Sequence, residues 1–449
     1  MKKSGINDII SLVIVKEIFR MLDINKIKNE KEKIISAIAK RGITVSLDQI
    51  ITLDEERRKL LQEIEQMKAE RNKVSASVPT LKKEGKNTDE VFAKMRALGD
   101  KIEKGDNKVK EVEAKLNDEL AALPNIPDDD IVAGGKENNK AIEVFGKKPE
   151  FKFKPKDHVE LCTSLGLVDY ERAVKLSGSG FCAYRDMGAR LEWAMLNFFI
   201  DEHIASNYEF VMPPHVLQNW CGFGAGQFPK FSDEVFSVNA VGQTADRFLL
   251  PTAEAALVNL YAGEIIPGDE LPKKFFAYTP CFRTEIGSYR AEERGMVRGH
   301  QFNKVEMVQI TTPEKSAEAF DEILAKAADL VKKLGLHFQI SKLAAGDISA
   351  SMTRTYDIEV WIPSMGVYKE VSSASCTGEY QARRNNTKFR DSNGKTQYVH
   401  MLNGSGLATS RLFPALVEQL QNEDGSVNIP EVLQKYMGGA KVISPKKVK

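Results

Sequence analysis

The sequence predicts an α+β protein: an N-terminal antiparallel α-helical coiled-coil arm, followed by a domain built on an antiparallel β-sheet with flanking helices. Two stretches with heptad spacing of apolar residues, joined by a polar turn that contains glycine, predict the arm. Strand-like runs at irregular spacing in the second half favour an antiparallel sheet over repeated βαβ units. At 449 residues the chain is long enough for two or more domains.

The composition is that of a soluble globular protein, with 42% hydrophobic and 28% charged residues. The 64 Lys and Arg residues nearly cancel the 63 Asp and Glu residues, so any contact with nucleic acid must come from local basic patches. The five cysteines form no CxxC pair, which argues against a zinc site and is typical of reduced thiols in a cytoplasmic enzyme. Neither GxGxxG nor GxxxxGKS/T occurs, which excludes the usual Rossmann and Walker nucleotide sites.

Residues 1–20 contain an apolar run that resembles an export signal only briefly. The run, residues 9–15, lacks a small-residue cleavage site and is too short to span a membrane. A purine-rich coding sequence for Lys16 and Glu17 would resemble a bacterial ribosome-binding site just upstream of Met21. We therefore expect translation to start at Met21, and residues 1–20 to be a mis-assigned or disordered extension.

The arm is expected over residues 53–123, within a helical domain that spans 21–123. Apolar residues recur there at steps of three and four, and the turn Gly85-Lys86-Asn87 separates two such stripes. The first stripe consists of Leu53, Leu60, Ile64, Met67, Val74, Val78 and Leu81, and the second of Val91, Met95, Leu98, Ile102, Val109, Val112, Leu116 and Leu123.

The outer half of the arm is basic, with eleven Lys or Arg and six Asp or Glu over residues 71–110. A basic tip suits a lever that reaches for a phosphate backbone. A solvated coiled coil whose charges serve solubility is an equally good interpretation. Pro79, Gly99 and Gly105 are expected to make the helices irregular towards the tip.

Residues 124–150 are predicted to be a linker, because the stretch after the arm is rich in proline, glycine and acidic residues. The second domain is expected over 151–440, and a basic tail over 441–449. A mostly buried helix is predicted over residues 188–205.

Strands are predicted at five places in the second domain. Runs of β-branched and aromatic residues predict them over 208–212, 274–278, 304–310, 357–362 and 366–371. The first of these would end at Pro213, since proline cannot continue a sheet hydrogen-bond ladder.

Three segments of the second domain carry a resemblance to class II aminoacyl-tRNA synthetases of the seryl type. Residues 279–306 (TPCFRTEIGSYRAEERGMVRGHQFNKVE) resemble motif 2, and residues 402–419 (LNGSGLATSRLFPALVEQ) resemble motif 3. The helix and strand that end at Pro213 resemble motif 1. Stretches such as LDEERRKLLQEIEQMKAERN, ALPNIPDDD and YDIEVWIP also look like bacterial seryl-tRNA synthetases, so that the resemblance covers residues 21 to about 439.

The resemblance implies that the protein activates serine with ATP and transfers it to the 3′-hydroxyl of the terminal adenosine of tRNA(Ser). The same family also serylates tRNA(Sec). It further implies a cytoplasmic homodimer that forms through motif 1 and has no membrane partner. The arm would sense the long variable arm of tRNA bound over the other subunit.

The ATP site implied by the resemblance has two catalytic arginines, Arg283 and Arg411. Adenylation joins two anions, so an enzyme must mainly position them and neutralise charge, which a planar guanidinium does well. Phe302 would stack on adenine, and Glu285 would accept from its amino group. The full implied set is Arg283, Thr284, Glu285, Gly299, Phe302, Glu370, Val371, Ser372, Ser373 and Arg411.

Glu370 and Ser373 are also implied to hold Mg²⁺ against the phosphates, since this ion needs few protein oxygens when phosphates supply the others. For serine, the resemblance implies that Glu306 reads the hydroxyl and that Glu254 lies near the amino group. A buried carboxylate matched to a hydroxyl rejects alanine, because it would be left unpaired. The implied serine-binding residues are Thr252, Ala253, Glu254, Glu306, Asn403 and Ser405.

Taken singly, each of these residues has an ordinary structural interpretation. Arg283 and Glu285 suit a cross-strand pair, and Phe302 suits a core position. Together, at the family's spacing, they favour a nucleotide site. The loop over 287–298 contains Arg290 and Arg294 and ends at Arg298. It is expected either to guide ATP and the acceptor end of tRNA or to be an ordinary solvated loop.

Two other functions remain open. One is an amino-acid:carrier-protein ligase, a class II relative without the arm. The other is a catalytically inactive, tRNA-binding paralogue. The sequence also departs from the family pattern at Arg354, in the loop that starts at Ile286, and at Thr409-Ser410 after GSGLA. None of these departures removes an implied ligand, and the loop changes are compatible with a secondary, inhibitor-tolerant copy of the enzyme as well as with the main one.

Overall fold

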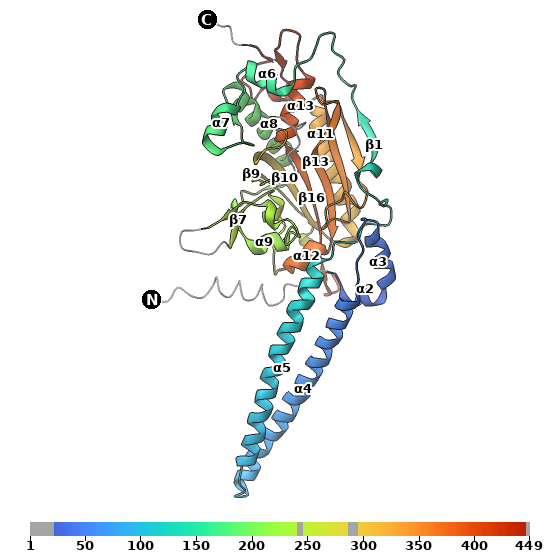
Figure 1. The fold of residues 1–449 in the computed structure, drawn as a ribbon, viewed down its shortest axis with the longest axis vertical. Helices are drawn as coiled ribbons and strands as arrows, with labels where there is room; N and C mark the ends of the chain where they lie inside the picture. Colours follow the sequence, from blue (N-terminus) through green and yellow to red (C-terminus); the bar gives the residue numbers. More distant parts are fainter. Residues whose placement is uncertain (1–21, 240–245, 286–294, 446–449) are drawn as a thin grey trace, which may run out of the picture. The chain divides into compact units, whose positions relative to one another are not determined.

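The computed structural model describes residues 22–239, 246–285 and 295–445, and the chain divides into two compact units (Figure 1). The arm unit extends to Pro124, except for the short segment Lys40–Ile43. The sheet unit consists of that segment and the chain from Asn125 onward.

Several predictions concern residues outside the described ranges. The expected extension over 1–20, the start at Met21, and Arg290 and Arg294 in the motif 2 loop all belong to this group.

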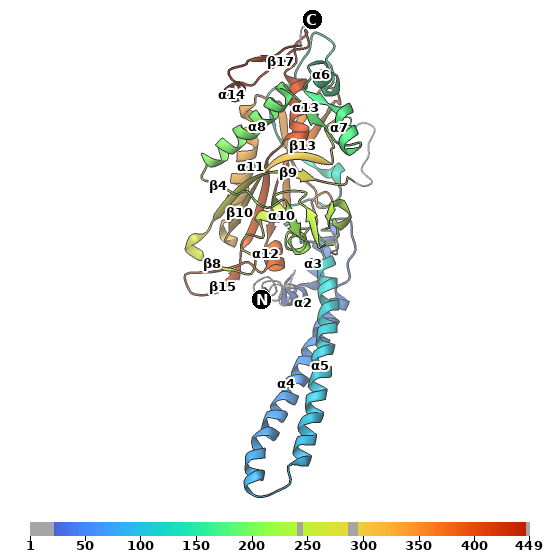
Figure 2. The same ribbon diagram turned by 90° about the vertical axis from the view of Figure 1, so that its left-hand side faces the viewer.

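The arm unit is helical, as predicted. Its short helices are α2 (Ile24–Asn29) and α3 (Lys31–Ala39), and its long ones are α4 (Asp48–Lys83) and α5 (Asp89–Ala122). Figures 1 and 2 show α4 and α5 side by side and antiparallel, joined by a turn over residues 84–88. At 1.5 Å per residue each long helix spans about 50 Å. The predicted coiled-coil arm is therefore confirmed.

The long helices are more regular than expected. α4 continues through Pro79, and α5 continues through Gly99 and Gly105. Gly105 has a packing role, because a Cβ atom there would lie 2.9 Å from Cγ1 of Ile64 on the facing helix. The glycine thus lets the two helices approach at this level, which offsets its low helix propensity.

A buried carboxylate joins α2 to α4 within the arm unit. The side chain of Asp54 is fully buried and lies 2.7 Å from Nζ of Lys28, 3.0 Å from Nη2 of Arg57 and 2.9 Å from Nε of Arg58. Burial opposes ionisation, but these cations outweigh it and lower the pKa of Asp54. The base of the arm therefore has a charged centre that would be costly to break.

An eight-stranded sheet forms the sheet unit, and all of its pairs are antiparallel except that between β4 and β9. This confirms the predicted sheet, and each predicted strand overlaps one of its members. In spatial order the strands are β1 (Lys140–Phe145), β11 (Phe338–Lys342), β12 (Arg354–Ile362), β13 (Val367–Gly378), β16 (His400–Ala408), β10 (Gln301–Thr311), β9 (Lys273–Phe282) and β4 (Glu209–Phe210).

Smaller elements complete the sheet unit. The helices are α6 (His158–Ser164), α7 (Tyr170–Ser177), α8 (Met187–Ile204), α9 (Asn219–Gly224), α10 (Glu254–Leu257), α11 (Ser316–Lys333), α12 (Tyr380–Asn385), α13 (Thr409–Gln419) and α14 (Glu431–Gln434). The strands are β2 (Val168–Asp169), β3 (Ala183–Tyr184), β5 (Val216–Gln218), β6 (Ser237–Val238), β7 (Arg247–Leu249), β8 (Ile265–Pro267), β14 (Lys388–Arg390), β15 (Thr396–Tyr398), β17 (Val427–Asn428) and β18 (Val442–Ile443).

Around the cavity the central strands have one mainly apolar face and one polar face, because successive side chains of a strand point to opposite sides. Further along β9, β10 and β16 the second face is apolar too and belongs to another core cluster. The apolar face packs with α8, α11 and α13 in the largest core cluster. Val305, Met307, Ala374, Ile358 and Leu402 belong to it. The alternate residues of the same strands therefore face the other way, where the candidate site lies.

Gly404 shows how closely α11 approaches this apolar face. A Cβ atom at this position would lie 2.4 Å from Cγ2 of Ile323 in α11. The glycine in the NGSG segment therefore has a packing role on the side of the sheet away from the site.

The structure differs from the prediction based on composition at two domain boundaries. β1 lies within the stretch 124–150, which composition predicts to be a linker, and pairs with β11. The ring of Phe145 stacks on Phe338 with the centroids 4.6 Å apart, which anchors β1. Likewise β18 lies within the predicted tail 441–449 and pairs with β17. Among the described helices, none has the length and apolar character that crossing a membrane requires.

Candidate active site

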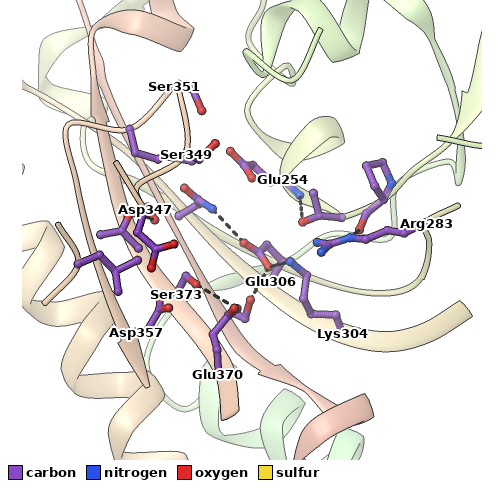
Figure 3. A pocket seen from close by; sticks show the side chains of 18 of the residues that line it. Glu254, Arg283, Lys304, Glu306, Asp347, Ser349, Ser351, Asp357, Glu370 and Ser373 are labelled. Carbon is purple, nitrogen blue, oxygen red and sulfur yellow. Dashed lines mark hydrogen bonds and ion pairs between the residues drawn. The ribbon is translucent and has the colours of Figure 1, made fainter. Parts of the chain in front are cut away.

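A cavity of about 480 Å³ opens on the polar face of the central strands (Figure 3). Side chains from β10, β12, β13 and β16 form its floor, and α10 and the end of β9 contribute further residues. Its lining includes basic residues (Arg283, Arg298, Lys304, Arg411) and acidic residues (Glu254, Glu306, Asp347, Asp357, Glu359, Glu370). Opposite charges therefore lie close together on one sheet face.

The two arginines predicted to be catalytic line the same cavity. Arg283 follows β9, and its Nε donates to the carbonyl of Pro251 at 3.3 Å. Arg411 lies in the first turns of α13, and its Nη1 donates to the carbonyl of Glu370 at 3.0 Å and lies 3.2 Å from Oε2 of the same residue. The two guanidinium groups thus come from different elements and line the same cavity.

A buried carboxylate, Glu306, lies at the centre of the floor. Its Oε2 accepts from the hydroxyl of Ser405 at 3.1 Å, and its Oε1 accepts from Nδ2 of Asn403 at 3.2 Å. Nζ of Lys304, two residues away on the same face of β10, is 2.5 Å from Oε2. Glu306 thus has a cation and two hydrogen-bond donors around it in a place that water barely reaches.

Glu254 is a second buried carboxylate. Its Oε1 accepts from Nε2 of Gln381 at 2.7 Å, and its backbone N–H donates to the hydroxyl of Thr252 at 3.2 Å. Burial, and then the charge of nearby Glu306, raise the pKa of Glu254 to about 7. A bound cation would favour its ionised form.

Glu370 and Ser373 are three residues apart on β13, which should place them on opposite faces of a regular strand. They share the polar face because the register shifts here: Asp357 pairs with Ser373, but Glu359 pairs with Glu370. Val371 is the additional residue, and its side chain is buried in the core. A β-bulge thus redirects Glu370 into the cavity.

The charges around Glu370 decide its ionisation. Burial opposes the charged form, but Arg411 and then Arg283 outweigh it, so that the pKa of Glu370 lies below its ordinary value. Asp357 behaves in the opposite way, since burial and the neighbouring Glu370 raise its pKa well above the usual range.

A smaller cavity of about 70 Å³ adjoins the first and shares Arg283 and Arg411 with it. Phe302 and Gly299 line it, and the guanidinium carbon of Arg283 lies 5.3 Å from the centre of the Phe302 ring. Glu285 also lines it, and its Oε2 is 2.5 Å from Nη1 of Arg298. An aromatic ring beside guanidinium groups suits a flat heterocycle next to phosphates.

Four of the predicted ligands do not line either cavity. Thr284 bonds through its hydroxyl to the carbonyl of Asp233, at 3.1 Å. Ala253 and Val371 are buried in the core, and the Ser372 hydroxyl donates to the carbonyl of Ser405 at 2.6 Å. These residues support neighbouring ligands rather than face the cavity with their side chains.

Among the residues in or beside the cavity that the predicted set lacks, Lys304, Asp357 and Gln381 lie next to predicted ligands. The alternation of side chains along β10 places Lys304 on the same face as Glu306, so its position in the cavity could have been predicted from the sequence. Asp357 required the pairing of β12 with β13, and Gln381 required the position of α12, which no local pattern reveals.

Two departures from the family pattern have structural partners. Arg354 holds the carboxylate of Asp128 with Nε at 2.5 Å and that of Asp130 with Nη2 at 2.9 Å. The Thr409 hydroxyl donates to Oε1 of Glu192 at 2.5 Å. Neither substitution disturbs a residue that lines the cavity.

No cluster of three or more His, Cys, Asp or Glu that could hold a metal ion occurs among residues 22–239, 246–285 and 295–445. Glu370 and Ser373 offer two oxygens on one face, 3.1 Å apart. Beside them, Oδ1 of Asp357 is buried and without a hydrogen-bond partner in the described structure. This donor set fits Mg²⁺ that phosphate oxygens and water would complete, rather than a site made by the protein alone.

Comparison with known proteins gives matches over both units. The model of the seryl-tRNA synthetase N-terminal domain matches residues 21–127. The model of the class II core domain of tRNA synthetases for G, H, P, S and T matches residues 237–420.

Curated relatives match along nearly the whole chain. Serine--tRNA ligase 2 of Clostridium acetobutylicum is 54% identical over 425 residues, which cover 94% of this chain and 100% of the relative. Serine--tRNA ligase of Clostridium tetani is 42% identical over 429 residues, with 94% and 100% covered. Among solved structures, the seryl-tRNA synthetase from Pyrococcus horikoshii complexed with ATP is 34% identical, has a TM-score of 0.87, and is matched over 95% of this chain and 100% of its own.

Proposed function

The chain belongs to the seryl-tRNA synthetase family, and we propose that the cavity on its sheet is where serine is activated with ATP before transfer to tRNA(Ser). The arrangement of Glu306, with Ser405 and Asn403 beside it and two arginines across the same face, carries this proposal. The solved relative with ATP bound supports the nucleotide. The chain is thus a serine--tRNA ligase, a class II enzyme, with a proposed place of action in the cytoplasm.

In the first step the serine carboxylate attacks the α-phosphate of ATP, and pyrophosphate leaves. Arg283 would contact both the carboxylate and the α-phosphate, so that it neutralises charge where the new bond forms. Arg411 would hold the γ-phosphate, and Phe302 would stack on adenine. Glu285, Gly299 and the backbone of residues 370–373 complete the proposed nucleotide site.

Serine would be recognised by two carboxylates of different environment. Glu254 would face the α-ammonium group of serine. Thr252 lies beside it, and Gln381 donates a hydrogen bond to its Oε1. Glu306 would accept from the serine hydroxyl, and Lys304 forms an ion pair with the same carboxylate. Alanine would leave the buried charge without a donor, which is costly.

We also propose that Glu370 and Ser373 hold Mg²⁺ against the phosphates. The ion would neutralise charge on the leaving pyrophosphate. Arg411 lies 3.2 Å from Oε2 of Glu370, so the same carboxylate orients an arginine and offers oxygen to the ion. In the second step the ribose 3′-hydroxyl of tRNA attacks the carbonyl carbon of the adenylate; the ester forms, the acyl–phosphate bond breaks and AMP leaves. Neither a histidine nor a cysteine nucleophile is needed for this step.

ATP–pyrophosphate exchange with a panel of amino acids tests this proposal. Serine should support exchange, and alanine should be poorer in kcat/KM by about 10⁴, as expected for a site that is built around a hydroxyl. Equal exchange with alanine would contradict the role of Glu306. Absence of exchange in a folded protein would favour the inactive paralogue, and aminoacylation of a carrier protein instead of tRNA would favour the carrier-protein ligase.

The pKa of Glu254 predicts how serine use depends on pH. Below its pKa of about 7 the free enzyme loses the negative charge that attracts the ammonium group, so kcat/KM for serine should fall, approaching tenfold per pH unit. The measurement is pyrophosphate exchange between pH 6 and 8 at saturating ATP. Glu254→Gln should be slower throughout and lack this limb; the same limb in both proteins would assign it to another group.

The arm is proposed to bind the long variable arm of tRNA(Ser), and of tRNA(Sec) where the cell makes one. Its tip is basic and exposed: Lys82, Lys83 and Lys86 lie around the turn between α4 and α5. Exposed lysines attract a phosphate backbone in a salt-dependent manner. The carrier-protein ligase alternative has no use for such an arm.

Replacing residues 82–88 by a short Gly-Ser turn should spare serine activation but lower kcat/KM for tRNA at least tenfold. Lys82, Lys83 and Lys86→Gln should do the same more weakly and reduce the salt dependence of charging. Pyrophosphate exchange of each variant serves as the internal control. Unchanged tRNA kinetics in the shortened protein would refute this role.

A homodimer is proposed to form through the α8 and β4 side of the sheet unit. Trp193 and Ile204 of α8 are about half exposed, and Met212 after β4 is 82% exposed. β4 is also an edge strand of the eight-stranded sheet. Apolar residues gathered beside a sheet edge are typical of an interface between subunits.

Sedimentation should therefore give twice the 50.1 kDa mass of one chain. Met212→Asp combined with Trp193→Asp should shift the protein to monomers. Val144→Asp is the matched control, since Val144 is exposed on β1, at the opposite edge of the sheet. A monomeric parent protein, or loss of dimers in the control alone, would contradict the proposed surface.

A further inference from the structure

We propose that Asp357 is a positioning residue for the divalent cation. Its buried carboxylate accepts a hydrogen bond from the Ser373 hydroxyl when the ion is bound, and so directs a lone pair of that hydroxyl towards the ion. This inference rests on the proposed function, because it assumes that Glu370 and Ser373 hold the ion. It adds a residue that was absent from the predicted set of ligands.

The geometry of two paired strands brings the groups together. Asp357 of β12 pairs directly with Ser373 of β13, and paired residues point to the same face of an antiparallel sheet. In the structure the Ser373 hydroxyl donates to Oε1 of Glu370, and Asp357 lies next to it across the strand pair. Figure 3 shows Asp357 beside Ser373 and Glu370 at the cavity floor.

A hydroxyl group has one proton and two lone pairs, which limits what Ser373 can do. Its Oγ lies 3.1 Å from Oε1 of Glu370, to which it can donate. If both oxygens bind a cation, that donation is lost, since the lone pairs must face the ion. The proton then needs another acceptor, and the carboxylate of Asp357 lies beside Ser373 on the paired strand.

Asp357 differs from the other acidic residues on this wall. Glu359 accepts from Nε2 of Gln339 at 2.8 Å and from the hydroxyl of Ser341 at 2.6 Å. Asp347 accepts from Nδ2 of Asn139 at 2.7 Å. Asp357 is only 7% exposed, yet its Oδ1 has no hydrogen-bond partner within the described parts of the chain.

A purely structural aspartate is the competing explanation. A buried carboxyl with a raised pKa can simply remain neutral and bond to Ser373. That explanation leaves Oδ1 unsatisfied beside a place where a cation, and its coordinated water, would lie. Groups that orient metal ligands commonly show this arrangement, and their loss typically weakens metal binding 10- to 100-fold.

The test is the affinity of Mn²⁺ for the protein loaded with α,β-methylene-ATP, measured from the electron paramagnetic resonance signal of free Mn²⁺. Asp357→Asn should weaken Mn²⁺ at least tenfold. Asp357→Leu, which removes the acceptor at similar size, should weaken it at least as much. Affinity for the nucleotide analogue in EDTA should stay within about twofold, which a general disturbance of the pocket would not allow.

Glu359→Gln is the matched control, since Glu359 lies on the same strand and lines the same cavity. Its Mn²⁺ affinity should remain within about twofold of the parent protein. Equal affinity in the parent and both Asp357 variants would overturn the inference, and so would an equal loss in the control.

A double-mutant cycle shows whether Asp357 acts through Ser373. In a Ser373→Ala background, Asp357→Asn should cause no further loss of Mn²⁺ affinity; additive losses would contradict the proposed route. Pyrophosphate exchange of the parent protein separates the two levels. Normal exchange with unaffected Mn²⁺ binding in the variants refutes only the role of Asp357, whereas absence of exchange refutes the proposed function.

Discussion

The ion pair between Lys304 and Glu306 is the interaction on which the rest of the site depends. With Nζ and Oε2 2.5 Å apart and both residues buried, it places a cation directly beside the carboxylate in the middle of the sheet. A buried charge without such a partner is costly, so each member of the pair makes the burial of the other possible. Arg283 and Arg411 line the same cavity as Glu254 and Glu370, and this mixture of charges on one sheet face suits a polyphosphate beside a zwitterion.

The sheet keeps these charges together because its two faces have separate tasks. Residues that alternate with the ligands pack against α8, α11 and α13, so any change of register would exchange core and cavity residues. The bulge at Val371 modifies this rule at one place: it buries the valine and turns Glu370 towards Ser373. A second register shift lies where β10 pairs with β16. Lys304 pairs with Ala408 but Glu306 pairs with Ser405, so the shift leaves Ser405 opposite Glu306. Function here depends on irregularities as much as on the regular sheet.

Much of the fold could be predicted from the sequence, because its signals are local. Heptad spacing predicted α4 and α5, and runs of β-branched and aromatic residues predicted the central strands. The limits of the second unit could not be predicted from proline and glycine content. The stretch predicted to be a linker contains β1, whose partner β11 lies about 200 residues later in the chain. Within the site, the resemblance to the seryl-type motifs implied Arg283, Glu306, Glu370 and Arg411 as ligands. Asp357 and Gln381 escaped prediction because only strand pairing and helix placement bring them to the cavity.

A crystal structure with a non-hydrolysable seryl-adenylate analogue, in which a sulfamoyl group replaces the phosphate, tests the central claim most directly. The serine hydroxyl should lie about 3 Å from the Glu306 carboxylate. The sulfamoyl group should lie beside Arg283, and the adenine should stack on Phe302. An analogue bound away from this sheet face, or one whose hydroxyl points away from Glu306, would contradict it.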